Sequence, residues 1–215
     1  PVAVARRWWE TGFRTLHLVD LDAALGSGDN LETLRELIRA TSAETQVGGG
    51  IRDDERADAL VEAGADRIVV GTRALDDPAW LRELVGRHPR RVTVAADTRE
   101  GMVLRKGWTE AAGMRVEELL AELGDLPLAG VLATDVGREG RLEGIDRAGV
   151  AATVAASPHP VWISGGVTTV EELEWLESTG AHGAVLGMAL YTETMDPEAV
   201  ARRFGGPHQE EAGAA

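Results

Sequence analysis

The chain contains an internal repeat that restricts the folds it can adopt. Residues 47–74 align without a gap with residues 163–190, at an offset of 116 residues. Each copy reads as a strand ending in Gly-Gly, an amphipathic helix and a second strand ending in glycine. Self-similarity at a fixed offset indicates two copies of one supersecondary unit within a larger architecture. The positions identical in both copies are, in the first, Gly49, Gly50, Glu55, Leu60, Gly64, Ala65, Val69 and Gly71.

Strand-like and helix-like segments alternate along the rest of the chain. Short apolar runs, typical of parallel strands buried on both faces, occupy residues 16–21, 45–48, 67–71, 92–96, 131–134, 161–164 and 184–187. Helical patterns lie near residues 1–11, 30–40, 53–63, 77–87, 115–123, 145–156, 169–178 and 196–204. This alternation predicts an α/β fold, a TIM (β/α)8 barrel with a two-fold half-barrel repeat that lacks its first β-strand. A doubly wound open sheet is the alternative, but it does not predict a gapless repeat.

The length of 215 residues fits one domain. We expect residues 1–204 to form a single barrel domain, with strands 2 to 8 and eight helices, and residues 205–215 to be a disordered tail. The repeat places the missing first strand about twenty residues before Pro1, so we interpret the chain as a fragment of a longer protein. An incomplete barrel exposes two unpaired strand edges, which could promote association.

Composition excludes several classes of function. The 22 basic and 36 acidic residues give a net charge of −14, which argues against nucleic-acid or anionic-membrane binding. No membrane-length apolar run or signal-like start is present. Cysteine is absent, which fits a cytoplasmic location. Neither metal-ligand spacing nor a Walker-type lysine occurs, so we expect no metal.

Glycine pairs follow two of the predicted strands. In barrels of this class the site forms at the carboxyl ends of the strands. Glycines there let backbone N–H groups approach a phosphate, and a following helix N-terminus adds partial positive charge. Tight turns alone are the alternative explanation. Two copies predict a small-molecule ligand with a phosphate at each end, bound by Gly49, Gly50, Gly71 and Thr72 in one copy and by Gly165, Gly166, Gly187 and Met188 in the other.

Two carboxylates are candidates for proton transfer. Asp97 directly follows the strand 92–96, where burial could raise its pKa toward neutrality; a turn-capping role is the alternative. Glu139 lies on the loop after the strand 131–134 and could reach over a substrate, although loop glutamates are usually solvated. Asp20 and Asp135 end two strands in matching contexts, which fits a shared structural role at least as well as a catalytic one. His17 lies inside an apolar strand and fits a core histidine.

A short loop carries a lysine and a tryptophan. Lys106 and Trp108 follow a predicted small hairpin at residues 102–105. Trp108 could stack on a planar ring and Lys106 could meet a phosphate or carboxylate. Packing of Trp108 against a long loop is the alternative.

Together these segments resemble HisA, the phosphoribosylformimino-aminoimidazole-carboxamide ribotide isomerase family of histidine biosynthesis. The resemblance covers the chain except its tail. The loop with Gly107-Trp108 favours this family over the sister cyclase HisF, which also needs a partner supplying ammonia. The matching segments are 17–23, 46–52, 70–72, 97–99, 106–110, 134–135, 164–166 and 185–190.

The resemblance implies an Amadori rearrangement, in which a bisphosphorylated aminoaldose becomes an aminoketose without metal or cofactor, in a monomeric enzyme. It implies that Asp97 is the proton donor, that Thr134 is a site residue and that the sixth-loop carboxylate is also an acid. That carboxylate is Glu139 here, one methylene longer than the family's Asp, and Arg141 stands where Thr is common. The family's base, an Asp on the first strand, has no counterpart in residues 1–215, so we expect little turnover from this segment alone.

Two further functions stay open. A PriA-type isomerase also converts phosphoribosylanthranilate, and the loops near Lys106–Trp108 and Arg138–Arg141 would decide between one and two substrates. A non-catalytic bisphosphate-binding fragment would bind the substrate without isomerising it.

Overall fold

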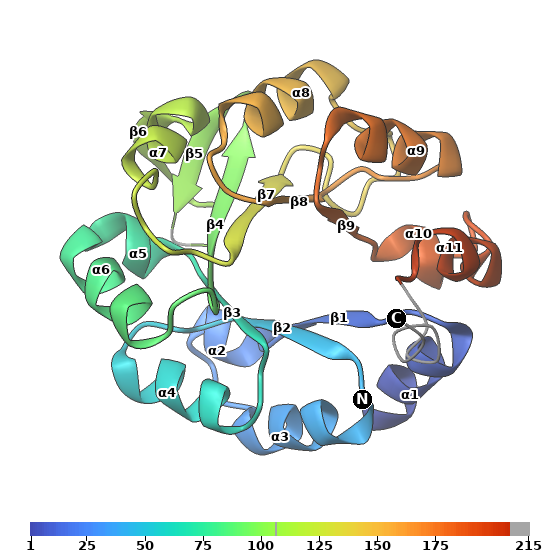
Figure 1. Ribbon diagram of the computed structural model, residues 1–215, viewed down its shortest axis with the longest axis horizontal. Coiled ribbons are helices and arrows are strands. Elements are labelled where there is room, and N and C mark those ends of the chain that lie inside the picture. Colours follow the sequence, from blue (N-terminus) through green and yellow to red (C-terminus); the bar gives the residue numbers. More distant parts are fainter. Residues whose placement is uncertain (106, 207–215) are drawn as a thin grey trace, which may run out of the picture. The chain divides into compact units, whose positions relative to one another are not determined.

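The computed structural model describes residues 1–105 and 107–206. Contacts along the chain divide it into two compact units, one formed by Pro1–Ile68 with the segment from Asp196 onward, and the other by Val69–Met195. The boundary falls inside strand β3 (Arg67–Val70), which contributes residues to both units. Each unit is described separately below, with the labels of Figure 1.

The first unit contains two parallel strands and the helices that alternate with them. Strand β1 pairs with β2 in parallel, with His17 opposite Gln46 and Val19 opposite Gly48. The elements are α1 (Val2–Thr11), β1 (Thr15–Val19), α2 (Leu21–Leu25), α3 (Leu31–Ala40), β2 (Glu44–Gly48), α4 (Asp54–Glu62) and α11 (Pro197–Phe204). Asp53 caps α4 by accepting a hydrogen bond from the Arg56 N–H, a typical stabilising contact at a helix N-terminus.

The second unit has parallel strands in the order β4-β7-β8-β9, with a hairpin on β4. The hairpin strands β5 and β6 are antiparallel, and Figure 1 shows them beside α7. The strands are β4 (Val92–Arg99), β5 (Met102–Arg105), β6 (Glu110–Arg115), β7 (Gly130–Asp135), β8 (Val161–Ser164) and β9 (Gly183–Val185). The helices are α5 (Thr72–Asp76), α6 (Pro78–Arg87), α7 (Val116–Glu122), α8 (Arg147–Ala156), α9 (Val170–Thr179) and α10 (Met188–Tyr191).

Every predicted strand and helix has its counterpart in the structure, with bounds that differ by a few residues. Parallel strands alternating with helices confirm the α/β fold class of the TIM barrel. The two copies of the repeat also share their backbone conformation. Gly71 and Gly187 precede short helices with nearly the same angles, φ −118° and ψ −111° for Gly71 and φ −116° and ψ −99° for Gly187.

Several local predictions were wrong. Strand β4 continues to Arg99 instead of ending at Ala96, because Thr98 and Arg99 pair with the hairpin strand β5. Asp97 therefore lies within a strand. The loop with Trp108 connects β5 to β6 instead of following a complete hairpin.

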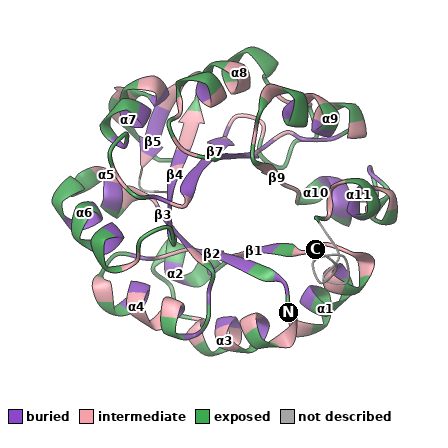
Figure 2. Ribbon diagram, in the orientation of Figure 1, coloured by how far each residue is buried: buried purple, intermediate pink, exposed green. Residues whose placement is uncertain are grey.

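Within the second unit, a tryptophan fills the inward face of the sheet. Trp162 forms a buried cluster with Val69 and Leu132, against which Ala95 and Val185 pack. Figure 2 shows much of β7 as buried. The indole needs space on both neighbouring strands: a Cβ at Gly130 would collide with the Trp162 ring, and a Cβ at Gly183 would lie 3.0 Å from it. The glycines at positions 130 of β7 and 183 of β9 thus leave the space that the Trp162 side chain fills on this face of the sheet.

Candidate active site

Three polar side chains form a row across neighbouring strands of the second unit. Asp97 on β4 lies opposite Thr134 on β7, and Thr134 lies opposite Ser164 on β8. Side chains in register on adjacent parallel strands point to the same face. Two residues earlier on the same strands are Ala95, Leu132 and Trp162 of the apolar cluster, so the polar row lies at the carboxyl ends of the strands, above a hydrophobic floor.

Asp97 is held by two donors. The indole Nε1 of Trp108 donates a hydrogen bond to Asp97 Oδ2 at 2.9 Å, and the hydroxyl of Thr134, which is buried, also hydrogen-bonds this carboxylate. Burial nevertheless dominates and raises the pKa of Asp97, while the two hydrogen bonds act to lower it. A half-buried carboxyl group with a raised pKa can retain a proton and donate it, as general acid catalysis requires.

The loop that carries Glu139 is anchored at both ends. At its start, Asp135 Oδ1 accepts a hydrogen bond from the Gly137 N–H at 2.9 Å, and Arg138 Nη1 donates to the Gly144 carbonyl at 2.9 Å. At its end, Glu172 of α9 accepts from the Ile145 N–H at 2.9 Å. These bonds fix the course of the loop, so Glu139 is presented near the polar row.

Glu139 interacts with the polar row directly. The Ser164 hydroxyl donates to Glu139 Oε2 at 3.4 Å. The residue is exposed as a whole, but partial burial of its carboxylate raises the pKa of Glu139. The Ser164 bond lowers this pKa and the charge of Asp97 raises it. The structure thus brings Asp97, Thr134, Trp108 and Glu139, predicted separately from the sequence, into one site.

Ser164 is the site residue that the sequence reasoning missed. It precedes Gly165 and Gly166, and the segment was interpreted only as a glycine motif. The available signal was its spacing: Ser164 ends its strand at the position equivalent to Thr134 on the preceding strand, as the register confirms. Lys106, predicted to meet a phosphate or carboxylate, lies outside the described residues, as do residues 207–215 of the predicted tail.

Both glycine pairs have a structural reason to be glycine. Gly49, Gly50, Gly165 and Gly166 all have positive φ values, between 68° and 100°. A Cβ at Gly49 would collide with the Asp20 backbone, and a Cβ at Gly165 would lie 2.5 Å from the Asp135 carbonyl oxygen. Close backbone packing therefore suffices to explain these glycines. The first pair belongs to the first unit, whereas Gly71, Thr72, the second pair, Gly187 and Met188 belong to the second.

Asp20 has the structural role that its context predicted. Its carboxylate accepts hydrogen bonds from the Ala23 N–H and the Asn30 N–H and pairs with Arg56 Nη2 at 2.6 Å. Burial acts to raise the pKa of Asp20, but these hydrogen bonds and the charge of Arg56 outweigh it and hold the pKa below its ordinary value. His17 is a core histidine: burial lowers its pKa, and its Nδ1 contacts Gln46 Oε1 at 2.9 Å.

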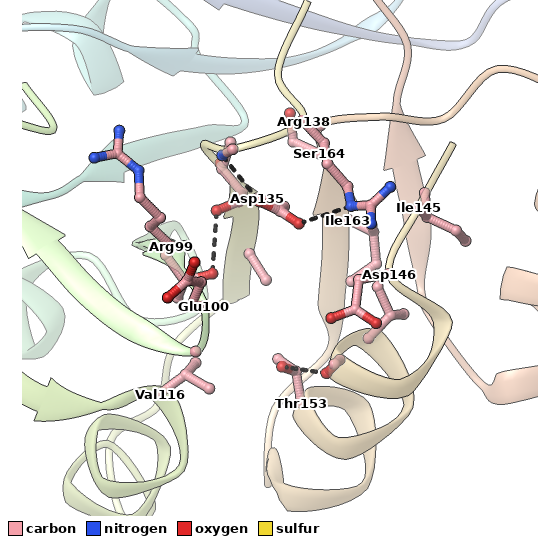
Figure 3. A pocket seen from close by; sticks show the side chains of 18 of the residues that line it. Arg99, Glu100, Val116, Asp135, Arg138, Ile145, Asp146, Thr153, Ile163 and Ser164 are labelled. Atoms are coloured by element: carbon pink, nitrogen blue, oxygen red, sulfur yellow. Dashed lines mark hydrogen bonds and ion pairs between the residues drawn. The ribbon is translucent and has the colours of Figure 1, made fainter. Parts of the chain in front are cut away.

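A hollow of about 680 Å³ lies between α7 and α8, and its lining includes Thr134 and Ser164 of the polar row. Figure 3 shows Arg99 and Glu100 on one side of it, and the Asp135–Arg138 ion pair, 3.4 Å long, within it. Its lining does not include Asp97, Trp108 or Glu139. Thr98 and Asp135, which also line the hollow, face away from the polar row because side chains alternate along the strands. Among the described residues, no three His, Cys, Asp or Glu side chains gather to hold a metal ion.

Comparison with known proteins identifies the family. Residues 1–196 match the model of a family described as histidine biosynthesis protein. The chain belongs to this family. The matched range includes Asp97, Thr134 and Ser164 of the polar row, and it also includes both glycine pairs. None of the helices in the described part of this family member is long and apolar enough to cross a membrane.

Curated relatives share most of their length with this member of the family. A protein of Gemmatimonas aurantiaca is 47% identical over 205 residues, covering 95% of this chain and 86% of the relative. A Myxococcus xanthus protein is 44% identical over 207 residues, covering 96% and 87%. A Natronomonas pharaonis protein is 42% identical over 192 residues, covering 89% and 80%. All three are named 1-(5-phosphoribosyl)-5-((5-phosphoribosylamino)methylideneamino) imidazole-4-carboxamide isomerase.

Proposed function

We propose that this protein is the isomerase of histidine biosynthesis. Its substrate is the bisphosphorylated aminoaldose that appears in the names of its relatives, and its product is the corresponding aminoketose. The reaction is an Amadori rearrangement: the ribose ring opens, the C2′ proton leaves, and the resulting enol tautomerises to the ketone. The observation that carries this proposal is the row of Asp97, Thr134 and Ser164 at the strand ends, with Trp108 and Glu139 beside it.

In this mechanism Asp97 is the proton donor to the ring oxygen. Its raised pKa favours the protonated form that this step needs, and Thr134 orients its carboxyl group. Glu139 is the second acid candidate, since its pKa is also raised. The base that the resembling family uses lies on the first barrel strand, and none of the residues proposed here takes that role.

The two phosphates are assigned to the glycine segments. Gly165, Gly166, Gly187 and Met188 form the proposed site for one phosphate, and the sequence repeat makes Gly49, Gly50, Gly71 and Thr72 the candidates for contacts to the other. Support comes from the shared backbone conformation of the two copies and from the N–H groups of a helix start, which lack intrahelical partners. Lys106 is retained as a proposed phosphate contact, and Trp108, with 42% of its surface exposed, as the contact to a planar ring.

The protein is further proposed to act in the cytoplasm as a monomer, on a small-molecule bisphosphate and without nucleic acid or a cofactor. The net charge of −14 and the absence of cysteine support this assignment. Association through exposed strand edges is the competing expectation. Sedimentation of the purified protein distinguishes a monomer from an associated species.

The deciding experiment measures isomerisation by the intact protein with the aminoaldose and, separately, with phosphoribosylanthranilate. Turnover of the first substrate alone supports the proposal. Turnover of both identifies a PriA-type enzyme. Bisphosphate binding without turnover of either substrate would overturn the proposal in favour of a non-catalytic binding protein.

A further inference from the structure

Ser164 differs from its neighbours in what it contacts. It is the last residue of β8 and lies opposite Thr134 on one side and Val185 on the other. Thr134 bonds Asp97, whereas the hydroxyl of Ser164 donates to Glu139 Oε2 at 3.4 Å. The hydroxyl groups of Thr134 and Ser164, which are neighbours in the row, therefore hydrogen-bond two different carboxylates, Asp97 and Glu139.

The second observation concerns the loop that carries Glu139. Its backbone is fixed by Asp135, Arg138 and Glu172, but none of these contacts orients the Glu139 side chain. Arg138, the nearest cation in sequence, pairs with Asp135 and with the Gly144 carbonyl. A glutamate has three rotatable side-chain bonds, and ordering it costs rotamer entropy. Among the residues that the structure describes, the side-chain hydrogen bond given for the Glu139 carboxylate comes from the Ser164 hydroxyl.

We propose that Ser164 is a positioning residue, whose hydroxyl holds the Glu139 carboxylate beside Asp97 so that the two carboxylates act as a coupled pair. This inference rests on the proposed function for the role of the pair in isomerisation. The bond is long for a hydrogen bond between oxygens, and catalytic hydrogen bonds commonly tighten only when substrate binds. The extra methylene of Glu139, relative to an aspartate, supplies the reach toward β8.

A carboxyl titration tests the geometry without any turnover. The ¹³C NMR signal of the Glu139 carboxyl, assigned by its loss in Glu139→Gln, is followed against pH. Because the Ser164 bond lowers the pKa of Glu139, Ser164→Ala should raise that pKa further, and Ser164→Thr, which keeps the hydroxyl, should restore it. Ser178→Ala is the matched control, since Ser178 bonds the Trp175 carbonyl on α9 and has no contact with the site. An unchanged pKa of Glu139 in Ser164→Ala overturns the inference.

Kinetics of the intact protein test the consequence. Ser164→Ala should lower kcat about five- to tenfold, the effect expected for one hydrogen bond of ordinary net strength, with KM changed less than twofold. The loss should disappear in a Glu139→Gln background, because the two residues act together. Additive losses, or a rise in KM at constant kcat, would contradict positioning and place Ser164 in substrate binding.

The two experiments separate the two proposals. A shifted carboxyl titration with no turnover by the intact wild-type protein leaves the Ser164–Glu139 contact established and rejects the isomerase. Turnover combined with an unmoved titration rejects the contact and leaves the isomerase in place.

Discussion

Trp108 Nε1 lies 2.9 Å from Asp97 Oδ2, so an exposed loop residue holds the carboxylate proposed as proton donor. Trp108 has a φ of 72°, a conformation that bulky residues rarely adopt. The hydrogen bond to Asp97 helps to maintain it. One residue thus combines an aromatic surface open to a ligand with a polar contact to the proposed acid.

Replacing Trp108 with phenylalanine keeps an aromatic ring and removes the N–H donor. Because this donor lowers the pKa of Asp97, Trp108→Phe should raise that pKa further and shift the basic limb of the pH–rate profile to higher pH. We expect kcat to fall about tenfold, as for loss of one hydrogen bond to a charged group. Trp175→Phe on α9 is the control. A pH profile identical to that of the wild type would show that the bond does not tune Asp97.

Asp97→Asn should abolish proton donation and stabilise the fold at neutral pH. General acid catalysis typically contributes about 10²- to 10⁴-fold, so kcat should fall by about that factor. The pKa of Asp97 is raised in the folded state. The folded protein therefore binds more protons than the unfolded chain between the two pKa values, and wild-type stability falls as pH rises through this window. Urea denaturation should show that Asp97→Asn is more stable than the wild type at pH 7 and that this difference is absent at pH 3.

The sequence predicted that Asp97 lies at the carboxyl end of a strand but not how its carboxylate is held. Asp97 was found because polar residues at the carboxyl ends of buried strands mark the sites of such barrels. The sequence did not predict the extension of β4 to Arg99. The segment Asp97-Thr98-Arg99 is polar and becomes a strand only by pairing with β5. The short helices α5 and α10 were missed because five and four residues are too few to show a helical period. The contact between Ser164 and Glu139 joins residues 25 apart in the chain, and no local pattern encodes it.

Asp20 and Asp29 offer a matched pair for testing the buried ion network of the first unit. Both bind Arg56, but the Asp20 side chain is fully buried and that of Asp29 is 59% exposed. Asp20→Asn should destabilise the protein by about 3 to 5 kcal/mol, because it leaves the buried Arg56 without its buried counter-charge. Asp29→Asn should cost about 1 kcal/mol or less. Thermal unfolding of both variants measures the difference, and equal costs would contradict the assigned role of burial.

The depressed pKa of Asp20 gives the same network a pH dependence. Since the folded-state pKa lies below the unfolded value of 3.8, the contribution of Asp20 is fully present above that value and is lost as pH falls through the folded pKa. Wild-type protein should therefore lose stability on acidification below about pH 4 more steeply than Asp20→Asn. Urea midpoints measured from pH 6 to pH 2 provide the comparison, and parallel curves would exclude Asp20 as the source.

Gly165 and Gly180 separate backbone strain from close packing. Both have positive φ, 91° and 87°, but a Cβ at Gly165 would lie 2.5 Å from the Asp135 carbonyl oxygen, whereas a Cβ at Gly180 would have no neighbour within 4 Å. Gly180→Ala should cost about 1 to 2 kcal/mol, the strain of an alanine in this region. Gly165→Ala should cost clearly more, because β7 must also shift, and it should weaken binding of a bisphosphate. Equal losses of stability in urea denaturation would contradict the role of the backbone contact at position 165. Phosphate binding would then remain as the reason for a glycine at this position.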